Sequence, residues 1–474
     1  MNTKQIREQT QEIVDKLLTQ NPTEEEKSNL RSFQILHNAY LQQIDEGKLG
    51  VEWEKVEALP QESAIDYTTL PKEYTKEETI EILKKTCIVK INGGLGTSMG
   101  CTGPKSVIEV RNGLTFLDII ILQLKGLTKQ YGVVVPLVLM NSFSTQKDTE
   151  KVIEKYKDDK DVVIKTFLQH KFPRIDAETL LPVPEKLEGR KEEWYPPGHG
   201  DFLQSFVDSE TFKELEKEGK EYLFLSNVDN LGATPDVSIM HYFASKQLDY
   251  ALELTPKTLN DIKGGTLIRY GDRLKMLEVA QVPSEHLSEF QDITKFKVFN
   301  TNSIWMNIKS IQEVVEQQTL LNNMDIIVNR KMDGERKVIQ LEIAVGCAVS
   351  AFKNTAAFIV PRSRFLPVKG CNDLFIIQSG LFGLTEDGHM IDKARKVSDI
   401  PPSIKFGKEF TFVADYQQHM KVLPTIDKLE SLVVEGNVIF GNNVVLEGNV
   451  VIRNTKEEEF ILENKTIVNE LIEN

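Results

Sequence analysis

The sequence has few cysteines and no long apolar run, and each absence excludes a class of protein. Its four cysteines, Cys87, Cys101, Cys347 and Cys371, form no close metal-ligand pair, and free thiols are expected in a chain without a secretory signal. No apolar run reaches the length of about 18 residues that a membrane span needs. No basic start followed by an apolar stretch opens the chain, so secretion is not supported. A cytoplasmic location is therefore expected.

The chain also lacks an excess of basic residues. Its 57 lysines and arginines are outnumbered by 71 aspartates and glutamates, which gives a formal net charge of −14. A protein that binds nucleic acid or membrane surfaces would present a basic face, so neither partner is expected. Anionic ligands must instead meet local lysines. With 27% charged and 40% hydrophobic residues the composition is that of an ordinary globular protein, and 474 residues suffice for two or three domains.

A glycine-rich turn is the most informative feature that the chain does contain. Residues 90–105 read Lys-Ile-Asn-Gly-Gly-Leu-Gly-Thr-Ser-Met-Gly-Cys-Thr-Gly-Pro-Lys, and an apolar strand is expected over Cys87–Ile91. Glycines lack the Cβ atom that would keep a triphosphate away from backbone N–H groups, and Lys105 adds a full positive charge. The turn therefore predicts a phosphate-binding loop.

Two better-known phosphate loops do not fit this turn. The Walker A loop needs a glycine directly before its lysine, and Pro104 stands there instead. The dinucleotide fingerprint needs the pattern G-x-G-x-x-G, but the next glycine after Gly94 and Gly96 is Gly100, one residue late. The helix expected after the turn also begins late, near Leu114.

The chain divides into a helical start and a longer region of alternating strands and helices. Residues 1–85 carry apolar side chains at helical spacing, and Thr23 with Glu26 and Thr75 with Glu78 form capping boxes. After residue 85, apolar strands alternate with amphipathic helices, which is typical of βαβ units and a parallel sheet. The expected strands are Cys87–Ile91, Val133–Met140 and Val162–Gln169, and the expected helices are Phe116–Leu127 and Thr145–Tyr156.

Polar segments follow several of the expected strands. Ligands of parallel sheets bind at the carboxyl ends of strands, so these segments are candidate sites. Tyr222–Gly232 begins as a buried strand and ends with Asn227, Asp229 and Asn230, where a carboxylate can hold Mg²⁺. Gln169 ends another strand with an amide that can both donate and accept hydrogen bonds. A polar turn over residues 194–201 carries His199.

The loop from Asn92 to Gly100, followed by Lys105, resembles the signature of the nucleotide sugar pyrophosphorylases, specifically the eukaryotic-type UTP–glucose-1-phosphate uridylyltransferases. The resemblance covers nearly the whole chain. It implies an α/β fold with a Rossmann-like nucleotidyltransferase core and a mixed, mainly parallel sheet. It also implies a helical N-terminal region and a C-terminal left-handed parallel β-helix. The expected domains are residues 1–85, 86–395 and 396–474.

The same resemblance implies a reaction and a role for each segment. UTP and glucose 1-phosphate would give UDP-glucose and pyrophosphate by in-line attack at the α-phosphorus, with Mg²⁺ and without a general base. Lys105, Asp229 and Lys369 would be catalytic, and Asp229 would be the metal ligand. UTP would be bound by Gly93, Gly94, Leu95, Gly96, Lys105, Gln169, Gly198 and Asn227, with Gln169 on uracil. The sugar phosphate would be bound by His199, Asn227, Lys263, Glu278, Asn302, Phe365 and Lys369.

A different architecture follows toward the C-terminus, visible as a six-residue repeat. This pattern is typical of a hexapeptide parallel β-helix, in which three units make about one coil. So short a coil must pack on a neighbour or extend through Phe460–Val468. A structural role, with a homo-oligomer formed through this domain, is expected; an acyltransferase would rest on the repeat alone. The repeat comprises Val434, Phe440, Leu446 and Ile452, then Val438, Val444 and Val450, with Gly436, Asn442 and Gly448 at the turns.

Two other functions stay open at this point. A broad-specificity UDP-sugar pyrophosphorylase would carry the same motifs, because sugar epimers differ by one hydroxyl group. A catalytically silent UTP-binding scaffold is disfavoured because Lys105, His199, Asp229 and Lys369 are all present. A preference for N-acetylglucosamine 1-phosphate is also disfavoured. Enzymes of that type usually carry an arginine after the Gly-Thr of the loop, where this chain has Ser98 and Met99.

Overall fold

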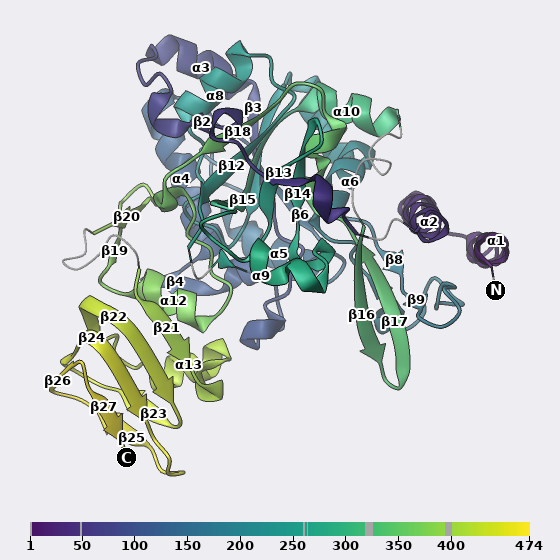
Figure 1. Cartoon of the computed structure of the whole chain (residues 1–474). Helices are drawn as coiled ribbons and strands as arrows, with labels where there is room; N and C mark the ends of the chain where they lie inside the picture. Colours follow the sequence, from purple (N-terminus) through teal and green to yellow (C-terminus); the bar gives the residue numbers. More distant parts are fainter. Residues whose placement is uncertain (1, 48–49, 259–260, 263, 318–325, 394–400) are drawn as a thin grey trace.

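An eight-stranded sheet forms the centre of the molecule (Figure 1). A computed structural model describes residues 2–47, 50–258, 261–262, 264–317, 326–393 and 401–474. In this sheet β15 runs antiparallel to β11 and β12, and the other neighbours are parallel, so the sheet is mixed and mainly parallel as predicted. Its order is β2 (Ile65–Asp66), β18 (Thr355–Ile359), β12 (Tyr250–Pro256), β15 (Val298–Asn307), β11 (Tyr222–Asn227), β3 (Thr86–Ile91), β6 (Leu137–Asn141) and β7 (Ile164–Leu168).

Helices cover both faces of this sheet. Side chains alternate along its strands, so both faces present apolar residues that another layer must bury. On β3, Ile88 faces one apolar core, which includes α3, α4 and α8, whereas Cys87 and Val89 face a second core, which includes α2, α6, α7 and α10. These helices are α2 (Glu24–Asp45), α3 (Lys76–Lys84), α4 (Phe116–Tyr131), α6 (Phe202–Asp208), α7 (Glu210–Lys217), α8 (Val237–Ser245) and α10 (Ile308–Glu316); α5 (Gln146–Ile153) and α9 (Leu287–Phe290) complete this part.

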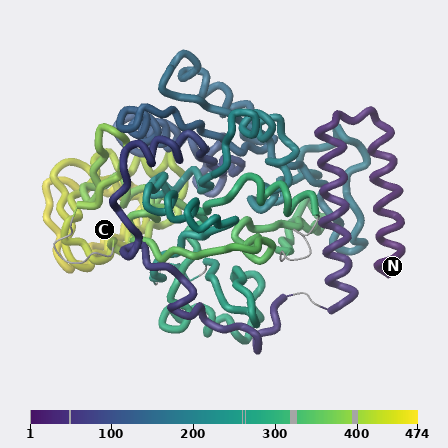
Figure 2. The backbone as a smooth tube through the Cα atoms, turned by 90° about the horizontal axis from the view of Figure 1, so that it is seen from above, coloured from purple at the N-terminus to yellow at the C-terminus, as the bar shows by residue number. Residues whose placement is uncertain are grey.

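The first 85 residues are less uniformly helical than the sequence predicts. α1 (Thr3–Leu18) and α2 lie together at one end of the molecule (Figure 2), and the capping boxes of α2 and α3 are confirmed. Between α2 and α3, however, β1 (Val56–Ala58) pairs with β13 (Thr266–Tyr270), and β2 pairs with β18 at the sheet edge. Tertiary pairing with these distant strands decides the local structure, which helical spacing could not reveal.

Two smaller sheets flank the centre. β1, β13 and β14 (Arg273–Leu277) form one, and β16 (Ile327–Asp333), β17 (Arg336–Glu342) and β9 (Ile175–Asp176) form the other. The β16–β17 hairpin projects from the molecule (Figure 1). Short two-stranded pairs join β8 (Phe172–Pro173) to β10 (Trp194–Tyr195), β4 (Glu109–Arg111) to β5 (Leu114–Thr115), and β19 (Phe382–Leu384) to β20 (Met390–Asp392).

The C-terminal residues form a unit of parallel strands at the end opposite to α1 (Figures 1 and 2). All its strand pairings in the described residues are parallel, and the apolar residues of the six-residue repeat are buried. A single apolar cluster contains buried residues of this unit, such as Leu432, and of the central part, such as Ile120, so the core of this unit continues into the central one. The elements are α12 (Cys371–Gln378), β21 (Ser403–Phe406), α13 (Val413–His419), β22 (Thr425–Glu435), β23 (Val438–Phe440), β24 (Val444–Arg453), β25 (Phe460–Leu462), β26 (Lys465–Val468) and β27 (Leu471–Glu473).

No disulfide joins the four cysteines in this structure. Across the described parts of the chain, no helix is both long enough and apolar enough to cross a membrane. The expected boundary at residues 395 and 396 lies outside the described residues.

Candidate active site

The glycine-rich loop begins where β3 ends, and hydrogen bonds from buried polar groups hold its first residues in place. The Asn92 amide donates to Asn141 Oδ1 at 2.7 Å and to Thr149 Oγ1 at 2.9 Å, and Ser142 Oγ donates to the Gly93 carbonyl at 2.8 Å. Further along, Gly96 N donates to the Gly103 carbonyl at 3.3 Å. The loop is therefore closed on itself and held at the carboxyl end of the sheet, where ligands of such folds bind.

The C-terminal unit touches this loop. Gly100 has a φ of +72°, a conformation that glycine adopts without strain. A Cβ atom added there would lie 2.7 Å from the ring of Phe412, which directly precedes α13. Phe412 thus occupies the space that a side chain on Gly100 would need. The position of the loop and that of the C-terminal unit are coupled through this contact.

Gln169, at the end of β7, lies directly against the loop. A Cβ atom added to Gly93 would lie 2.0 Å from Gln169 Nε2, closer than any real contact. The Gln169 backbone donates to the Asn141 carbonyl at 2.8 Å, and its side chain is buried. The sequence predicted both segments as site residues without indicating that they touch, because they come from different strands.

We expect Gly93→Ala to weaken UTP binding about tenfold, because the new methyl group must displace the Gln169 amide and cost a hydrogen bond of about 1 to 2 kcal/mol. Gly103→Ala is the matched control, since its methyl group would meet no atom closer than 3.7 Å. Calorimetric titration with UTP gives both affinities. Equal affinities of the two variants would contradict the expectation.

Three charged side chains meet at the end of β11. Lys105 Nζ donates to Asp229 Oδ2 at 2.8 Å and also to the Val368 carbonyl, and Lys369 Nζ lies 3.1 Å from the same Asp229 oxygen. Asp229 and Lys105 are largely buried, whereas the Lys369 side chain is 61% exposed. Burial alone would raise the pKa of Asp229, but the charges of Lys369 and Lys105 outweigh it and lower that pKa. The carboxylate is therefore ionised and bound by two cations.

The segment that delivers Lys369 is fixed against the same strand end. Asn230 Oδ1 accepts from Leu366 N at 2.8 Å, and the Asp229 carbonyl accepts from Val368 N at 3.1 Å. A buried ion pair supports it from behind: Arg364 donates to both oxygens of Glu253, at 2.7 and 2.8 Å. Neither Arg364 nor Glu253 was predicted as a site residue, although an acid inside the apolar strand Tyr250–Pro256 indicates a buried partner.

A second buried lysine supports the turn after β11. Lys90 Nζ donates to Ser226 Oγ at 2.7 Å and to the Ala233 carbonyl at 2.8 Å. In the sequence these two acceptors lie on either side of the segment that contains Asn227 and Asp229. Burial, followed by the charge of Arg364, lowers the pKa of Lys90 to about 7. Lys90 was not predicted as a supporting residue, because a lysine next to a glycine-rich loop is not by itself a sign of burial.

His199 lies in a turn pressed against residues 343–345. Gly198 has a φ of +83°, and Gly200 N donates to the Ile343 carbonyl at 2.9 Å. His199 Nδ1 accepts from Val345 N at 3.1 Å, so Nε2 carries the proton of the neutral ring. Burial, followed by the charge of Lys369, lowers the pKa of His199 to about 4. The imidazole is neutral near pH 7 and can donate one hydrogen bond through Nε2.

The predicted sugar-phosphate residues come from several strands. Asn302 Nδ2 donates to Asn227 Oδ1 at 2.8 Å, and Asn302 Oδ1 is a buried acceptor without a protein partner among the described residues. Glu278 lies against Gly265, where a Cβ atom would be 2.6 Å from its carboxylate, and burial raises the pKa of Glu278. The rings of Phe299 and Phe365 are 5.2 Å apart. Lys263 lies outside the described residues.

The described residues contain no cluster of three or more His, Cys, Asp or Glu side chains that could hold a metal ion. The sequence predicted a single protein ligand, Asp229, and in the structure that carboxylate contacts Lys105 and Lys369. A magnesium ion bound there would have to take its remaining ligands from water and substrate phosphates, which is its usual behaviour in phosphate-handling sites.

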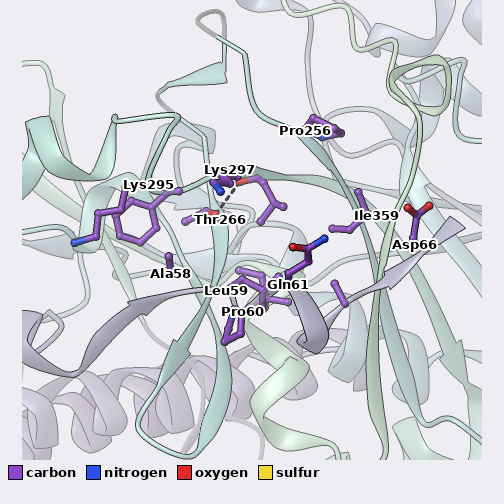
Figure 3. Close-up of a pocket in the computed structure, with 14 residues that line it drawn as sticks. Ala58, Leu59, Pro60, Gln61, Asp66, Pro256, Thr266, Lys295, Lys297 and Ile359 are labelled. Atoms are coloured by element: carbon purple, nitrogen blue, oxygen red, sulfur yellow. Dashed lines mark hydrogen bonds between the residues drawn. The ribbon is translucent and has the colours of Figure 1, made fainter.

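The structure also contains a cavity of about 380 Å³ (Figure 3). It is lined mainly by apolar residues of β13, β15, β18 and the chain after β1, among them Leu59, Leu267 and Ile359. Lys295 and Lys297 also line it. None of the predicted site residues belongs to this lining, so the cavity is not the site described above.

Comparison with known proteins gives a consistent result. A family described as UTP–glucose-1-phosphate uridylyltransferase matches residues 30–447. The chain is 48% identical over 402 residues to UTP–glucose-1-phosphate uridylyltransferase 2 of Dictyostelium discoideum, covering 85% of this chain and 79% of that protein. The UDP-glucose pyrophosphorylase of Leishmania major has a similar structure, with a TM-score of 0.86 and 29% identity, covering 98% of this chain and 99% of that one. A variant of the Leishmania protein in complex with UDP-glucose matches with a TM-score of 0.85, 28% identity and the same coverage. The chain therefore belongs to the UTP–glucose-1-phosphate uridylyltransferase family.

Proposed function

We propose that this protein transfers the uridylyl group of UTP to glucose 1-phosphate, forming UDP-glucose and pyrophosphate. The observation that carries the proposal is the cluster of Lys105, Asp229 and Lys369 at the end of β11, next to a loop of glycines. Two lysines and a carboxylate suit a reaction between phosphate groups. Family membership and the names of the relatives above support the same substrates.

The proposed step is an in-line displacement at phosphorus. An oxygen of the sugar phosphate forms a bond to the α-phosphorus of UTP, while the bond from that phosphorus to the departing pyrophosphate breaks. The phosphate nucleophile is already ionised near neutral pH, so no general base is needed. His199, with its low pKa, suits hydrogen-bond donation to phosphate and not proton abstraction. Catalysis then depends on positioning and on charge stabilisation.

Each predicted residue has a place in this proposal. Lys105 and the loop residues Gly93, Gly94, Leu95 and Gly96 hold the β- and γ-phosphates. Lys369 neutralises charge that grows around the α-phosphorus. Gln169 binds uracil, and Gly198 and Asn227 also contact UTP. His199, Asn227, Glu278, Asn302, Phe365 and Lys263 bind the sugar phosphate. The cytoplasmic location expected from the sequence stays a prediction.

Mg²⁺ is the proposed metal, with Asp229 as its protein ligand. A single buried carboxylate at a strand end fits this ion, which binds through one or two carboxylates together with substrate phosphates. When bound, the ion supplies neutralisation of the reacting phosphates. The two lysines that contact Asp229 in this structure are then free to turn toward phosphate oxygens.

The experiment that tests the function is pyrophosphate release from UTP and Mg²⁺ with glucose 1-phosphate, galactose 1-phosphate, N-acetylglucosamine 1-phosphate or no sugar. Dominant release with glucose 1-phosphate supports the proposal. Similar rates with several sugars would make the protein a broad UDP-sugar pyrophosphorylase. No release from folded protein that binds UTP would refute the activity and favour a scaffold.

We also propose that the C-terminal strands form a short left-handed parallel β-helix that joins copies of the chain. The buried six-residue repeat supports the coil. Exposed apolar side chains on three consecutive strands support the interface: Ile461 on β25 is 54% exposed, Val468 on β26 is 49% exposed and Leu471 on β27 is 53% exposed. Apolar surface at the end of a parallel array favours association.

The double variant Ile461→Asp, Leu471→Asp is expected to be monomeric and active, because charges would oppose burial of these positions between copies. Light scattering after size exclusion gives the mass, and pyrophosphate release gives the activity. The surface variant Lys456→Asp, in the turn between β24 and β25, controls for added negative charge. A wild-type protein that is already monomeric at micromolar concentration would contradict the proposal.

A further inference from the structure

One buried ion pair next to the proposed UTP site has no part in the reaction described above. His170 directly follows Gln169, and Asp201 comes two residues after His199. Asp201 forms two hydrogen bonds with His170: Oδ2 accepts from the His170 backbone N at 2.7 Å, and Oδ1 bonds to the His170 ring Nδ1 at 2.6 Å. Both side chains are almost completely buried, with 4% and 3% exposure. Such a bond joins two segments that are 31 residues apart in the chain.

The surroundings of His170 favour a charged ring. Burial would lower its pKa, but the carboxylate of Asp201, with a smaller contribution from Asp208, outweighs burial and raises the pKa of His170 to about 10. His170 Nε2 lies 3.4 Å from Asp208 and 3.3 Å from the hydroxyl of Ser28 on α2. The ring also stacks on Phe172 at 5.8 Å. Near pH 7 the pair is therefore a salt bridge inside the protein, which keeps its geometry fixed.

Fixing this geometry fixes the backbone directly after Gln169. A glutamine amide can present either its oxygen or its NH₂ group after a half turn about its last bond, so on its own it accepts both uracil and cytosine. Selectivity requires that the amide be held in one place and one orientation. The Gln169 amide packs directly against Gly93, where a Cβ atom would lie 2.0 Å from Nε2, and the backbone of the next residue, His170, is bonded to Asp201.

Asp201 is also part of the turn that carries His199, the residue proposed to contact phosphate. Asp201 N donates to the Gly198 carbonyl at 3.3 Å, and the turn that contains His199 is bonded to Ile343 and Val345. Asp201 therefore joins the strand end that carries Gln169 to the turn that carries His199. Moving one of these side chains relative to the other would break bonds of a buried charged group, which are among the strongest in proteins.

We propose that the Asp201–His170 pair is a positioning device that holds Gln169 and the His199 turn in one rigid unit and thereby sets selectivity for UTP over CTP. The proposal rests on the proposed function, since it assumes that Gln169 faces the base. Neither Asp201 nor His170 touches substrate in this proposal; both act through their neighbours.

The test is the ratio of the affinities for UTP and CTP, measured by calorimetry in the presence of Mg²⁺. In Asp201→Asn we expect this ratio to fall about tenfold, mostly through weaker UTP binding, with kcat at saturating UTP changed less than the affinity. Asp208→Asn is the matched control. It removes a carboxylate that also faces His170, but one that does not bond to the backbone beside Gln169, and its ratio should stay at the wild-type value.

Folded Asp201→Asn protein with the wild-type ratio would overturn the proposal, and so would an equal fall in Asp208→Asn. Should Asp201→Asn fail to fold, His170→Asn carries the test, because it keeps the backbone bond to Asp201 and loses the ring bond; a smaller fall in the ratio is expected. Binding does not depend on turnover, so the outcome is separate from that of the pyrophosphate assay. Wild-type protein that releases no pyrophosphate but prefers UTP would refute the activity alone.

Discussion

Lys369→Ala is expected to lower kcat by about tenfold to a hundredfold while the protein stays folded. The Lys369 side chain is 61% exposed and contacts only Asp229 among the bonds described above, so its loss leaves no cavity. In the proposed reaction its charge balances charge that grows around the α-phosphorus. A charge-assisted hydrogen bond is worth about 1.5 to 3 kcal/mol, and about 1.4 kcal/mol corresponds to a factor of ten in rate.

The measurement is steady-state kinetics of pyrophosphate release, together with the thermal midpoint of unfolding. Lys353→Ala is the control, because Lys353 is an exposed lysine in the turn before β18 and lies outside the site. Lys369→Arg separates charge from position: partial activity is expected, because the guanidinium keeps the charge but not the compact ammonium geometry. An unchanged kcat in Lys369→Ala would remove Lys369 from the mechanism.

Asp229→Asn is expected to have a larger effect, a loss of kcat of about a hundredfold or more. Bound metal contributes several kcal/mol of charge stabilisation in phosphate chemistry, and this variant removes the proposed ligand. UTP affinity should change much less. The two lysines that Asp229 holds in this structure lose their carboxylate partner and stay available for phosphate oxygens.

A titration with Mg²⁺ at fixed substrates distinguishes the proposed role from a general loss of structure. The variant should need far more Mg²⁺ for half-maximal rate, and the wild-type protein should lose activity when a chelator removes the metal. Asp272→Asn, at the exposed turn between β13 and β14, serves as the control. The same Mg²⁺ dependence in variant and wild type would contradict the assignment of Asp229.

Much of the fold could be predicted from local sequence patterns. The expected strand Cys87–Ile91 is β3 with one residue added, and the helix expected over Phe116–Leu127 is α4 with one further turn. These elements were predictable because burial on both faces and capping chemistry act within a few residues. β1 and β2 were not predictable in this way, since each exists only because a strand from far along the chain lies beside it.

In the site, too, features set by local sequence were predictable, whereas contacts between distant segments were not. The sequence indicated Lys105, Asp229 and Lys369, because the glycine loop, the strand end and the family pattern each point to one of them. The structure brings them together and adds the residues that hold them, such as Arg364 paired with Glu253. Supporting pairs escape prediction because each partner, taken alone, reads as an ordinary buried or surface residue. Only their contact distinguishes them.

The pairing of β2 with β18 has a consequence for how the chain folds. Ile65 pairs with Phe358, so residues made early during synthesis must wait for a strand made late before the edge of the central sheet can close. Until then, the edge of one strand or the other offers unpaired backbone groups to other chains. β18 leads directly into the segment that carries Lys369. Completion of the sheet edge and of the active site should therefore be a single late event, and slow refolding with transient aggregation is expected to end together with the return of activity.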